Sequence, residues 1–564
     1  MTDPNRSAKT IRWWPVVIIF GLAAIAGSYA WLKNDLNHQR QFMQTAGVTI
    51  IAVLLLLIWL LFFSRLRWKI RWGIFTAFVL LAVSAAALLR VRGLSGNVVP
   101  LLEFRWSTPP APPSGNITVA RFDSMASVPD SPQALPLAAV PEMKSVSEAS
   151  RGKAVRKIDS VTKNARTAAT NPAHDYPQFL GPHRDARKYG IKLARDWSQQ
   201  PPQRMWRQRV GAGWSAFAVL GEFAITQEQR GEQELVICYA LKSGQVIWSH
   251  SDAVKYESPI AGNGPRATPT ILHDRVYTLG ATGLLNCLNL ANGERFWVKD
   301  ICQDNNAKVN SYGMTGSPLV LDSLVVVSAG GSSGNSLVAY HKKSGERIWN
   351  AGNDPAGYAS PLLTTLAGQP QILIFNRGNV VAHDPGSGKI LWQHPWPNNT
   401  ECVAQPLPLA GDRVFVSSGY GIGGKLFQIR HVVDGEWQAT LVYETSRLKA
   451  KFSNVVFHQG YIYGLDDGIM VCLDPANGER KWKGGRYGHG QVILVEDLVL
   501  IQAENGEVIL VEAIPESHRE LTRFAALEGK TWNNPALAGP YLLVRNDREA
   551  ACYELEVVRG GSDQ

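Results

Sequence analysis

The stretch CLDPANGERKW at Cys472–Trp482 repeats, almost letter for letter, the stretch CLNLANGERFW at Cys287–Trp297. A Gly followed four residues later by a Trp also occurs at Gly244, Gly345 and Gly388. Most neighbouring copies lie 43 to 52 residues apart, and the double gap before Gly478 contains a degenerate copy, VVDGEWQATLVYE. A repeat of this length with alternating β-branched residues predicts four-stranded propeller blades, since helical repeats would need longer runs of 3.6-residue period.

One repeat unit carries the expected strand and turn signals. The segment GPRATPTILHDRVYTLGATGLLNCLNLANGERFW alternates apolar and polar residues between turns at His273-Asp274, Thr282-Gly283 and Asn292-Gly293. Asn-Gly steps supply the positive φ angles of tight hairpins, so the unit predicts four strands. The closing Trp has a large flat indole ring that can pack between neighbouring blades. One blade cannot bury both of its faces alone, so the unit must be repeated to provide neighbours.

The number of blade openings predicts the size of the ring. First strands begin in eight stretches: WSAFAVLGEFAIT, RATPTILHDRVYTLG, TGSPLVLDSLVVVS, YASPLLTTL, AQPLPLAGDRVFVSS, FSNVVFHQGYIYGL, GHGQVILVEDLVLI and NNPALAGPYLLVR. The last unit ends near Val558 with no closing Trp, whereas an orphan PPQRMWRQRV with Trp206 precedes the first. We therefore predict an all-β, eight-bladed β-propeller over residues 176–564, in which the orphan strand completes blade eight and removes the exposed edges.

Residues 1–92 predict a membrane anchor of three transmembrane α-helices. Apolar runs at about 14–32, 46–63 and 73–89 have the length that crosses about 30 Å of hydrocarbon. The second loop holds Arg65, Arg67, Lys69 and Arg71, so it is expected to be cytoplasmic and the chain after the third helix extracytoplasmic. Alternatively, Ser28-Tyr29-Ala30 marks a signal-peptidase site and the first run is cleaved, which leaves the exit side unchanged.

Residues 93–175 predict a Pro/Ala/Ser-rich linker. The segment contains STPPAPPSG and few aromatic residues, which is typical of an extended disordered chain. As a flexible coil of about 80 residues it would reach on the order of 50 Å. The alternative is a helical domain around 142–166.

The net charge of +10 does not indicate a nucleic-acid partner. Residues 1–175 hold 20 Lys and Arg against 9 Asp and Glu, and residues 176–564 hold 37 against 38. The globular part is therefore about neutral, and the cationic excess belongs to the topology signals and the tether.

The Gly-x-x-x-Trp endings, with Ala-Leu or Cys-Leu upstream, resemble the tryptophan-docking repeats of pyrroloquinoline quinone (PQQ) type propellers. That superfamily includes quinoprotein alcohol dehydrogenases, membrane-bound glucose dehydrogenase and an eight-bladed lipoprotein of outer-membrane protein assembly. YPQFLGPHRDA at 176–186, followed by GPRATP, resembles bacterial PQQ-binding-like β-propeller repeat proteins. The resemblance implies the fold over residue 175 to the C-terminus and leaves the chemistry open.

For the alcohol dehydrogenases, the resemblance implies PQQ stacked between a Trp and a disulfide of adjacent cysteines, with Ca²⁺ and an Asp base. This chain has no adjacent cysteine pair among Cys238, Cys287, Cys302, Cys402, Cys472 and Cys552, and no Cys-x-x-Cys-His for haem. Four of these cysteines share one third-strand position, which favours a packing role. The absence of an adjacent cysteine pair does not exclude a PQQ enzyme, because membrane-bound glucose dehydrogenases resemble this chain in their N-terminal helices and lack that pair.

The blades can be aligned on a Ser/Thr-Pro step near the start of their first strands, such as Ser317-Pro318. The residues three positions before this Pro, or before the residue that replaces it, should converge at one mouth of the channel. They are Trp214, Arg266, Thr315, Tyr358, Val403, Lys451, Tyr487 and Trp532. We interpret Trp214, Arg266, Tyr358, Lys451, Tyr487 and Trp532 as a candidate cofactor- or ligand-binding set, able to grip a flat anionic ligand by stacking and charge. The alternative is that the aromatics plug a narrow channel and the cations face water.

Polar residues nearer the Pro position add His489, Gln405, Ser453 and Asn534, and His489 is a weak catalytic candidate because imidazole titrates near neutrality. The nearest acids are Glu401, Asp304, Asp466 and Asp467, which do not form the oxygen ring that calcium requires; no metal site is predicted. Asp467-Gly468 is more simply interpreted as a turn.

Two functions follow. The first is a membrane-tethered propeller in the periplasm, anchored in the inner membrane, that binds an envelope protein or a small molecule and needs no cofactor. The second is a PQQ- and Ca²⁺-dependent dehydrogenase that oxidises an alcohol or sugar and reduces membrane quinone.

Overall fold

The computed structural model of the chain describes residues 12–32, 38–106, 174–332, 334–397, 401–432 and 435–558. Three helices come first: α1 (Trp14–Leu32), α2 (His38–Ile58), which continues as the π-helical turn η1 (Trp59–Phe63), and α3 (Trp68–Leu88). Within the described residues, three helical segments are long and apolar enough to cross a membrane: Trp14–Leu32, Gln41–Phe63 and Trp68–Leu88. The second and third begin five residues earlier than their apolar runs, because polar residues continue each helix at its N-terminal end.

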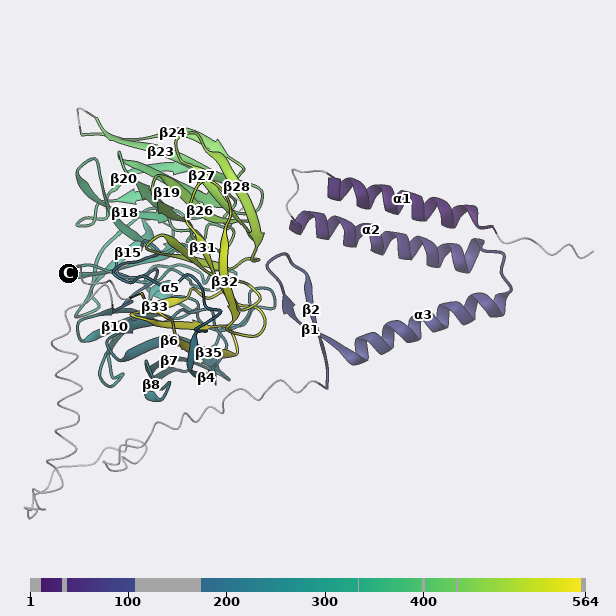
Figure 1. Ribbon diagram of the computed structural model, residues 1–564, viewed down its shortest axis with the longest axis horizontal. Coiled ribbons are helices and arrows are strands. Elements are labelled where there is room, and N and C mark those ends of the chain that lie inside the picture. Colours follow the sequence, from purple (N-terminus) through teal and green to yellow (C-terminus); the bar gives the residue numbers. More distant parts are fainter. Residues whose placement is uncertain are drawn as a thin grey trace, which may run out of the picture.

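A β-hairpin follows α3 with no intervening loop. Strands β1 (Leu89–Leu94) and β2 (Pro100–Phe104) pair antiparallel, with a bulge between Val91 and Gly93. In Figure 1 the hairpin lies between the helices and the large β-structure. The prediction of a disordered linker is therefore wrong for residues 93–106, whereas residues 107–173, including the alternative helical region, lie outside the described residues.

The described residues after 174 fold almost entirely into four-stranded antiparallel sheets, with the short helix α5 (Ile301–Asp304) as an exception. The first four sheets are β5 (Ala218–Leu220), β6 (Phe223–Arg230), β7 (Gln233–Ala240) and β8 (Val246–Asp252); β9 (Thr270–Leu272), β10 (Arg275–Leu279), β11 (Leu284–Asn289) and β12 (Arg295–Asp300); β13 (Leu319–Val320), β14 (Leu324–Gly331), β15 (Asn335–His341) and β16 (Arg347–Ala351); and β17 (Leu362–Leu366), β18 (Gln369–Phe375), β19 (Asn379–His383) and β20 (Ile390–Pro395).

The remaining sheets follow the same order along the chain. They are β21 (Leu407–Leu409), β22 (Arg413–Ser418), β23 (Gly423–His431) and β24 (Trp437–Thr445); β25 (Val456–His458), β26 (Tyr461–Asp466), β27 (Ile469–Asp474) and β28 (Glu479–Arg486); β29 (Gln491–Val495), β30 (Leu498–Gln502), β31 (Glu507–Glu512) and β32 (Glu520–Ala525), with β3 (Arg187–Lys188) added in parallel to β29; and β33 (Ala536–Ala538), β34 (Tyr541–Arg545), β35 (Glu549–Glu554) and β4 (Gln203–Arg209).

Strand β4 belongs to the last sheet although it precedes the first one in the sequence. It pairs antiparallel with β35, with Trp206 opposite Cys552. The orphan strand thus has the partner that the sequence predicts, and the N- and C-terminal ends of the β-structure are joined by backbone hydrogen bonds.

The repeated sequence explains how neighbouring sheets pack. In the second sheet Cys287 lies opposite Trp297, as Cys472 lies opposite Trp482 in the sixth. The indole of Trp248 reaches the next sheet: its Nε1 donates to the carbonyl of Leu290 at 2.8 Å, and its ring lies where a Cβ on Gly293 would be. The glycine of the motif is therefore required both for its positive φ of 75° and for the approach of the neighbour's indole.

Candidate functional site

A cavity of about 230 Å³ lies where the first strands begin. All eight sheets contribute to its lining, through Trp214, Arg266, Thr315, Tyr358, Val403, Lys451, Gln491 and Trp532 among others. We call this lined opening the mouth. Seven of these eight residues, all except Gln491, are those that the alignment of the repeats on the Ser/Thr-Pro step predicted to converge.

Tyr487, in contrast, is not among the residues that line the described cavity. Its hydroxyl donates to Glu520 at 2.7 Å and lies 2.9 Å from Nε2 of His518. The repeat containing Tyr487 has Gly490 in place of the Pro, and Gly485 and Gly488 turn the chain with positive φ angles. This sheet contributes Gln491 to the cavity instead.

The mouth is rich in aromatic rings and cations. The rings of Trp214 and Trp532 lie 4.9 Å apart, and Nζ of Lys530 lies 4.1 Å from the ring centre of Trp532. The guanidinium of Arg266 lies 4.6 Å from the ring centre of Tyr256 and donates to the carbonyls of Gly262 and Gly264. Burial lowers the pKa of Arg266 to about 10, so it remains a cation at neutral pH.

Lys451 is almost completely buried, with 3% of its surface exposed. Its Nζ lies 5.1 and 5.2 Å from the ring centres of Tyr420 and Phe452 and donates to the carbonyl of Gly96 at 2.5 Å. Burial lowers the pKa of Lys451 to about 8, partly offset by Asp467 and Glu504. Lys451 is therefore held by the β1–β2 hairpin rather than pointing to water.

The hairpin tip, residues 94–98, lies in the mouth. The amide of Gly96 donates to Oε1 of Glu504 at 2.8 Å, and Nζ of Lys530 donates to the carbonyl of Leu94 at 3.3 Å. Residues Leu94, Ser95, Gly96 and Val98 all line the cavity. One side of the cavity is thus formed by a segment that directly follows α3.

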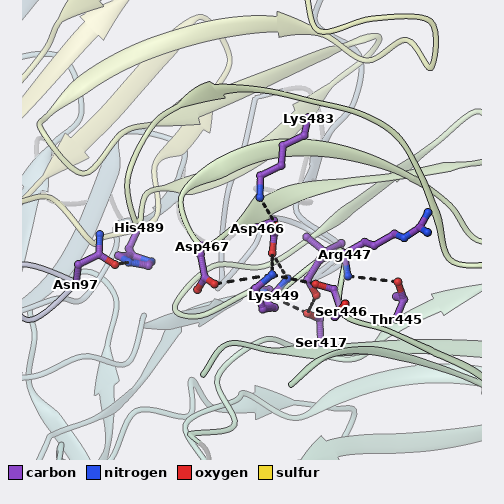
Figure 2. A network of polar contacts seen from close by, with 12 residues as sticks. Asn97, Ser417, Thr445, Ser446, Arg447, Lys449, Asp466, Asp467, Lys483 and His489 are labelled. Atoms are coloured by element: carbon purple, nitrogen blue, oxygen red, sulfur yellow. Dashed lines mark hydrogen bonds and ion pairs between the residues drawn. The ribbon is translucent and has the colours of Figure 1, made fainter. Parts of the chain in front are cut away.

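His489 lies against this tip. Its Nε2 is 3.0 Å from Oδ1 of Asn97, and its ring centre lies 5.3 Å from that of Phe452. Figure 2 shows the two side chains facing one another. The geometry gives His489 a role in holding the tip; its catalytic role stays a prediction.

Phe179 comes from the segment 176–186, the YPQFLGPHRDA stretch, and also lines the cavity. Within that segment Arg184 is 2% exposed and donates at 3.0 Å to each of the carbonyls of Ser317 and Pro318, while the amide of Gln405 donates to the Arg184 carbonyl at 2.5 Å. A buried guanidinium is tolerated here because carbonyl oxygens accept from both of its terminal nitrogens. The motif that distinguishes the sequence thus ties the first, third and fifth sheets together beside the cavity, with Tyr176 bridging to Val219.

Three buried polar atoms of lining residues have no hydrogen-bond partner. They are Oη of Tyr358, Oε1 of Gln491 and Oδ1 of Asn534. Buried polar atoms are normally paired, so these atoms are available to a ligand or to water in the cavity.

The carboxylates near the mouth are already engaged. Oε2 of Glu401 lies 3.1 Å from Arg377. Glu504 accepts from the Trp532 indole at 2.9 Å and from the amides of His489 and Gly96. Although burial alone would raise its pKa, the nearby imidazole of His489 and these hydrogen bonds hold the pKa of Glu504 below its ordinary value.

The other predicted acids belong to a separate network and a turn. Figure 2 shows Asp466 between Lys449 and Lys483; its carboxylate lies 2.6 Å from Nζ of Lys449 and also pairs with Lys483. Asp467 and Gly468 have φ angles of 47° and 87° and form the two-residue turn between β26 and β27, which confirms that interpretation. Asp304 ends the short helix α5 and is not part of the cavity lining.

The donor set does not fit calcium-bound PQQ. Calcium takes six to eight oxygen ligands, and within the described residues no three His, Cys, Asp or Glu side chains are grouped to hold a metal ion. All six cysteines are buried. Cys302 and Cys402 lie outside the repeated third-strand position, as the sequence indicates.

The sequence did not identify Tyr312 and Tyr420, which line the cavity, or Glu504 and Lys530, which hold the hairpin tip beside it. Glu504 lies in the turn between β30 and β31, within AENGE, which has the composition of an ordinary turn. Lys530 lies in the connection before Trp532. Nothing in their local sequence distinguishes these residues, because only the convergence of separate sheets brings them together.

A family model described as outer membrane protein assembly factor BamB matches residues 232–484. No functionally curated protein matches the chain. Three of the similar solved structures are a quinohemoprotein alcohol dehydrogenase from Comamonas testosteroni (12% identity, 72% of this chain and 86% of that chain, TM-score 0.53), BamB from Moraxella catarrhalis (16%, 64% and 99%, 0.47) and a europium-containing methanol dehydrogenase (12%, 68% and 91%, 0.43).

At these identities the solved structures bear on the fold alone, and of the three the alcohol dehydrogenase has the TM-score that supports it. The matched segment contains all five Gly-x-x-x-Trp motifs and ends two residues after the fifth. Together with the four-stranded sheets, these findings fit a PQQ-like β-propeller fold for the β-structure of this chain.

Proposed function

We propose that this protein is a non-enzymatic binding module: a membrane-tethered, extracytoplasmic PQQ-like β-propeller whose mouth takes a flat, anionic small molecule. The single observation that carries the proposal is the cavity of about 230 Å³ between aromatic rings and two cations, the half-buried Arg266 and the buried Lys451. Stacking and charge together favour a planar anion. The unpaired atoms of Tyr358, Gln491 and Asn534 would orient it.

The eight sheets are proposed to form one closed eight-bladed ring. In support, Trp206 of the last sheet donates to the carbonyl of Leu241 in the first at 2.8 Å, and its ring lies against Gly244. Residues from all eight sheets meet at one cavity, as the inner ends of radial blades would.

The proposed location is the periplasmic face of an inner membrane, with α1, α2 and α3 as the anchor. Lys and Arg in the connection between the second and third helices support a cytoplasmic position for that connection. The β-structure then lies outside the cytoplasm, where an envelope protein is a further candidate partner.

The carboxylates near the mouth favour the binding module over a dehydrogenase, because both are engaged with other groups of the protein. Glu401 is paired with Arg377, and Glu504 is committed to Trp532, His489 and Gly96. Neither leaves a set of free oxygens around the cavity for calcium.

The test uses the full chain in lipid nanodiscs, titrated with PQQ as a planar anionic probe and followed by quenching of tryptophan fluorescence. We expect binding that does not need Ca²⁺, that weakens at least about tenfold in Arg266→Ala, and that is unchanged in Arg523→Ala on the outer strand β32. No reduction of an acceptor dye is expected with alcohols or glucose.

Absence of binding would contradict the proposed ligand class. Ca²⁺-dependent dye reduction that disappears in Arg266→Ala would contradict the non-enzymatic assignment and favour the dehydrogenase.

A further inference from the structure

We propose that the β1–β2 hairpin is a lid on the propeller mouth, and that its tip must leave before a ligand of ordinary size can enter. The inference rests on the proposed function for the identity of the site that is covered. The docking of the tip is a separate feature, carried by hydrogen bonds between residues some 350 to 440 positions apart in the chain.

The mouth binds the backbone of the tip. Lys451 and Lys530 donate to the carbonyls of Gly96 and Leu94, and Glu504 accepts the amide of Gly96. The same Glu504 oxygen accepts from the indole of Trp532, so the tip and a stacking residue of the ligand site share one acceptor. While the tip is docked it occupies one N–H of each lysine and one oxygen of Glu504, so a ligand that uses these groups must compete with the tip.

Gly96 is the residue that allows this fit. A Cβ built on Gly96 would collide with the imidazole of His489, whereas a Cβ on Gly93, three residues earlier, would meet only Nζ of Lys530 at 3.7 Å. Larger side chains at position 96 should therefore displace the tip, and a methyl group at position 93 should not.

The tip is also held in a strained turn. Val98 has a φ of 63°, in the left-handed region that β-branched residues avoid, and its amide donates to the carbonyl of Ser95 at 2.8 Å. Such conformations persist where surrounding contacts impose them. Here the turn's own hydrogen bonds impose the conformation, since the amide of Ser95 also donates to the carbonyl of Val99 at 2.9 Å. The contacts of Gly96 and Asn97 then hold the formed turn against the mouth.

The size of the cavity indicates what the lid excludes. With the tip in place the volume is about 230 Å³, below the roughly 300 to 1,000 Å³ of pockets that enclose drug-sized ligands. Withdrawal of residues 94–98 would enlarge the same cavity and release Lys451 and Glu504 for other partners.

The lid is connected directly to the membrane anchor. Helix α3 ends at Leu88 and β1 begins at Leu89, so six strand residues, about 20 Å, separate the helix from the tip. A shift of α3 would therefore act on the tip without an intervening flexible segment. In this arrangement the mouth faces the helices, as Figure 1 shows for the hairpin and α3.

The experiment measures access to the cavity in the full chain in nanodiscs. Ser360 lines the cavity and is 2% exposed, and the six native cysteines are buried, so Ser360→Cys provides one reporter thiol. Its rate of modification by a small methanethiosulfonate is compared in three backgrounds: the native hairpin, Gly96→Val and Gly93→Ala.

We expect Gly96→Val to increase the rate at least about tenfold, because the rate follows the open fraction of the lid, and Gly93→Ala to leave it unchanged. Equal rates in all three backgrounds would overturn the lid. Gly96 lies outside the propeller sheets, and an unchanged melting temperature confirms that the faster reaction is not unfolding.

PQQ binding in the same hairpin variants, with Ser360 restored, separates the two proposals. Tighter binding by Gly96→Val supports both. A faster thiol reaction without PQQ binding in any variant supports the lid and contradicts the ligand class. Equal PQQ affinity with the native hairpin and Gly96→Val overturns the lid while the ligand site stands.

Discussion

The indole of Trp206, in the strand that precedes the first sheet, lies against Gly244 of that sheet while its strand is hydrogen-bonded to the last sheet. This relationship joins the two ends of the β-structure. Since Trp206 is 9% exposed and its Nε1 donates to Leu241 at 2.8 Å, the contact is both apolar and polar.

Trp206→Ala is expected to reduce the free energy of unfolding by about 3 to 5 kcal/mol, because it leaves a cavity between the last and first sheets. Trp437→Ala is the matched control. Trp437 is the first residue of β24, and its ring centre lies 4.4 Å from that of His431. Loss of this stacking should reduce the free energy of unfolding by about 1 kcal/mol. Denaturant unfolding measures both. Similar losses for the two variants would show that Trp206 does not close a ring.

Alanine variants at Gly293 and Gly368 distinguish the two requirements on the repeat glycine, which are a positive φ and room for the neighbouring indole. Both have positive φ, 75° and 77°, but a Cβ on Gly293 meets Trp248 and a Cβ on Gly368 meets nothing within 4 Å. Gly368→Ala should cost about 1 to 2 kcal/mol from backbone strain alone, and Gly293→Ala at least about 1 kcal/mol more from overpacking. Equal melting temperatures of the two variants would contradict the docking role of the motif.

The raised pKa of Glu234 predicts that the free energy of unfolding depends on pH. Burial raises its pKa from 4.5 to about 7, although the amide of Ala281 and the charge of Arg266 act in the opposite direction. Between these two pH values the folded state binds more protons than the unfolded state, so stability falls as the pH rises. Glu234→Gln should remove this fall and be more stable at pH 8 by about 2 kcal/mol.

Thermal melts at pH 5 and pH 8 measure the effect, with Glu222→Gln as the control because the Glu222 side chain is 67% exposed. A parallel pH dependence in the native protein and Glu234→Gln would contradict the assignment.

The six cysteines should be unreactive in the folded protein. All are buried, and burial raises the pKa of Cys472 and of Cys552 to about 12. Thiolate is the reactive form, so a colorimetric thiol reagent should detect no cysteines in the native state and six after unfolding. Four after unfolding would indicate a disulfide, for which Cys302 and Cys402 are the pair that the repeat does not explain.

The fold was predictable because its rules are local and repeated. A Gly four residues before a Trp places the turn and the docking plate in one motif, and Cys472 opposite Trp482 is the same pair as Cys287 opposite Trp297. The degenerate repeat was harder to interpret, because Tyr443 rather than Trp437 takes the docking position against Gly478.

The mouth was predictable only in part. Trp214, Arg266, Tyr358, Lys451 and Trp532 follow from their place in the repeat, although Phe217 and Asn454 stand where the Pro would follow Trp214 and Lys451. Tyr487 has the same place in its repeat and is not among the lining residues. The tip at Gly96 could not be found this way, since its short strands carry little alternation and its partners, Lys451 and Glu504, lie hundreds of residues away.

The docking of the hairpin is the central claim, and a distance measurement by double electron–electron resonance tests it most directly. Spin labels at Leu102→Cys on β2 and Ile348→Cys on β16, both exposed in the native protein, report the position of the hairpin on the propeller in nanodiscs. We predict one narrow distance distribution that becomes broad in Gly96→Val and stays narrow in Gly93→Ala. A broad distribution with the native hairpin, indistinguishable from that of Gly96→Val, would contradict the account.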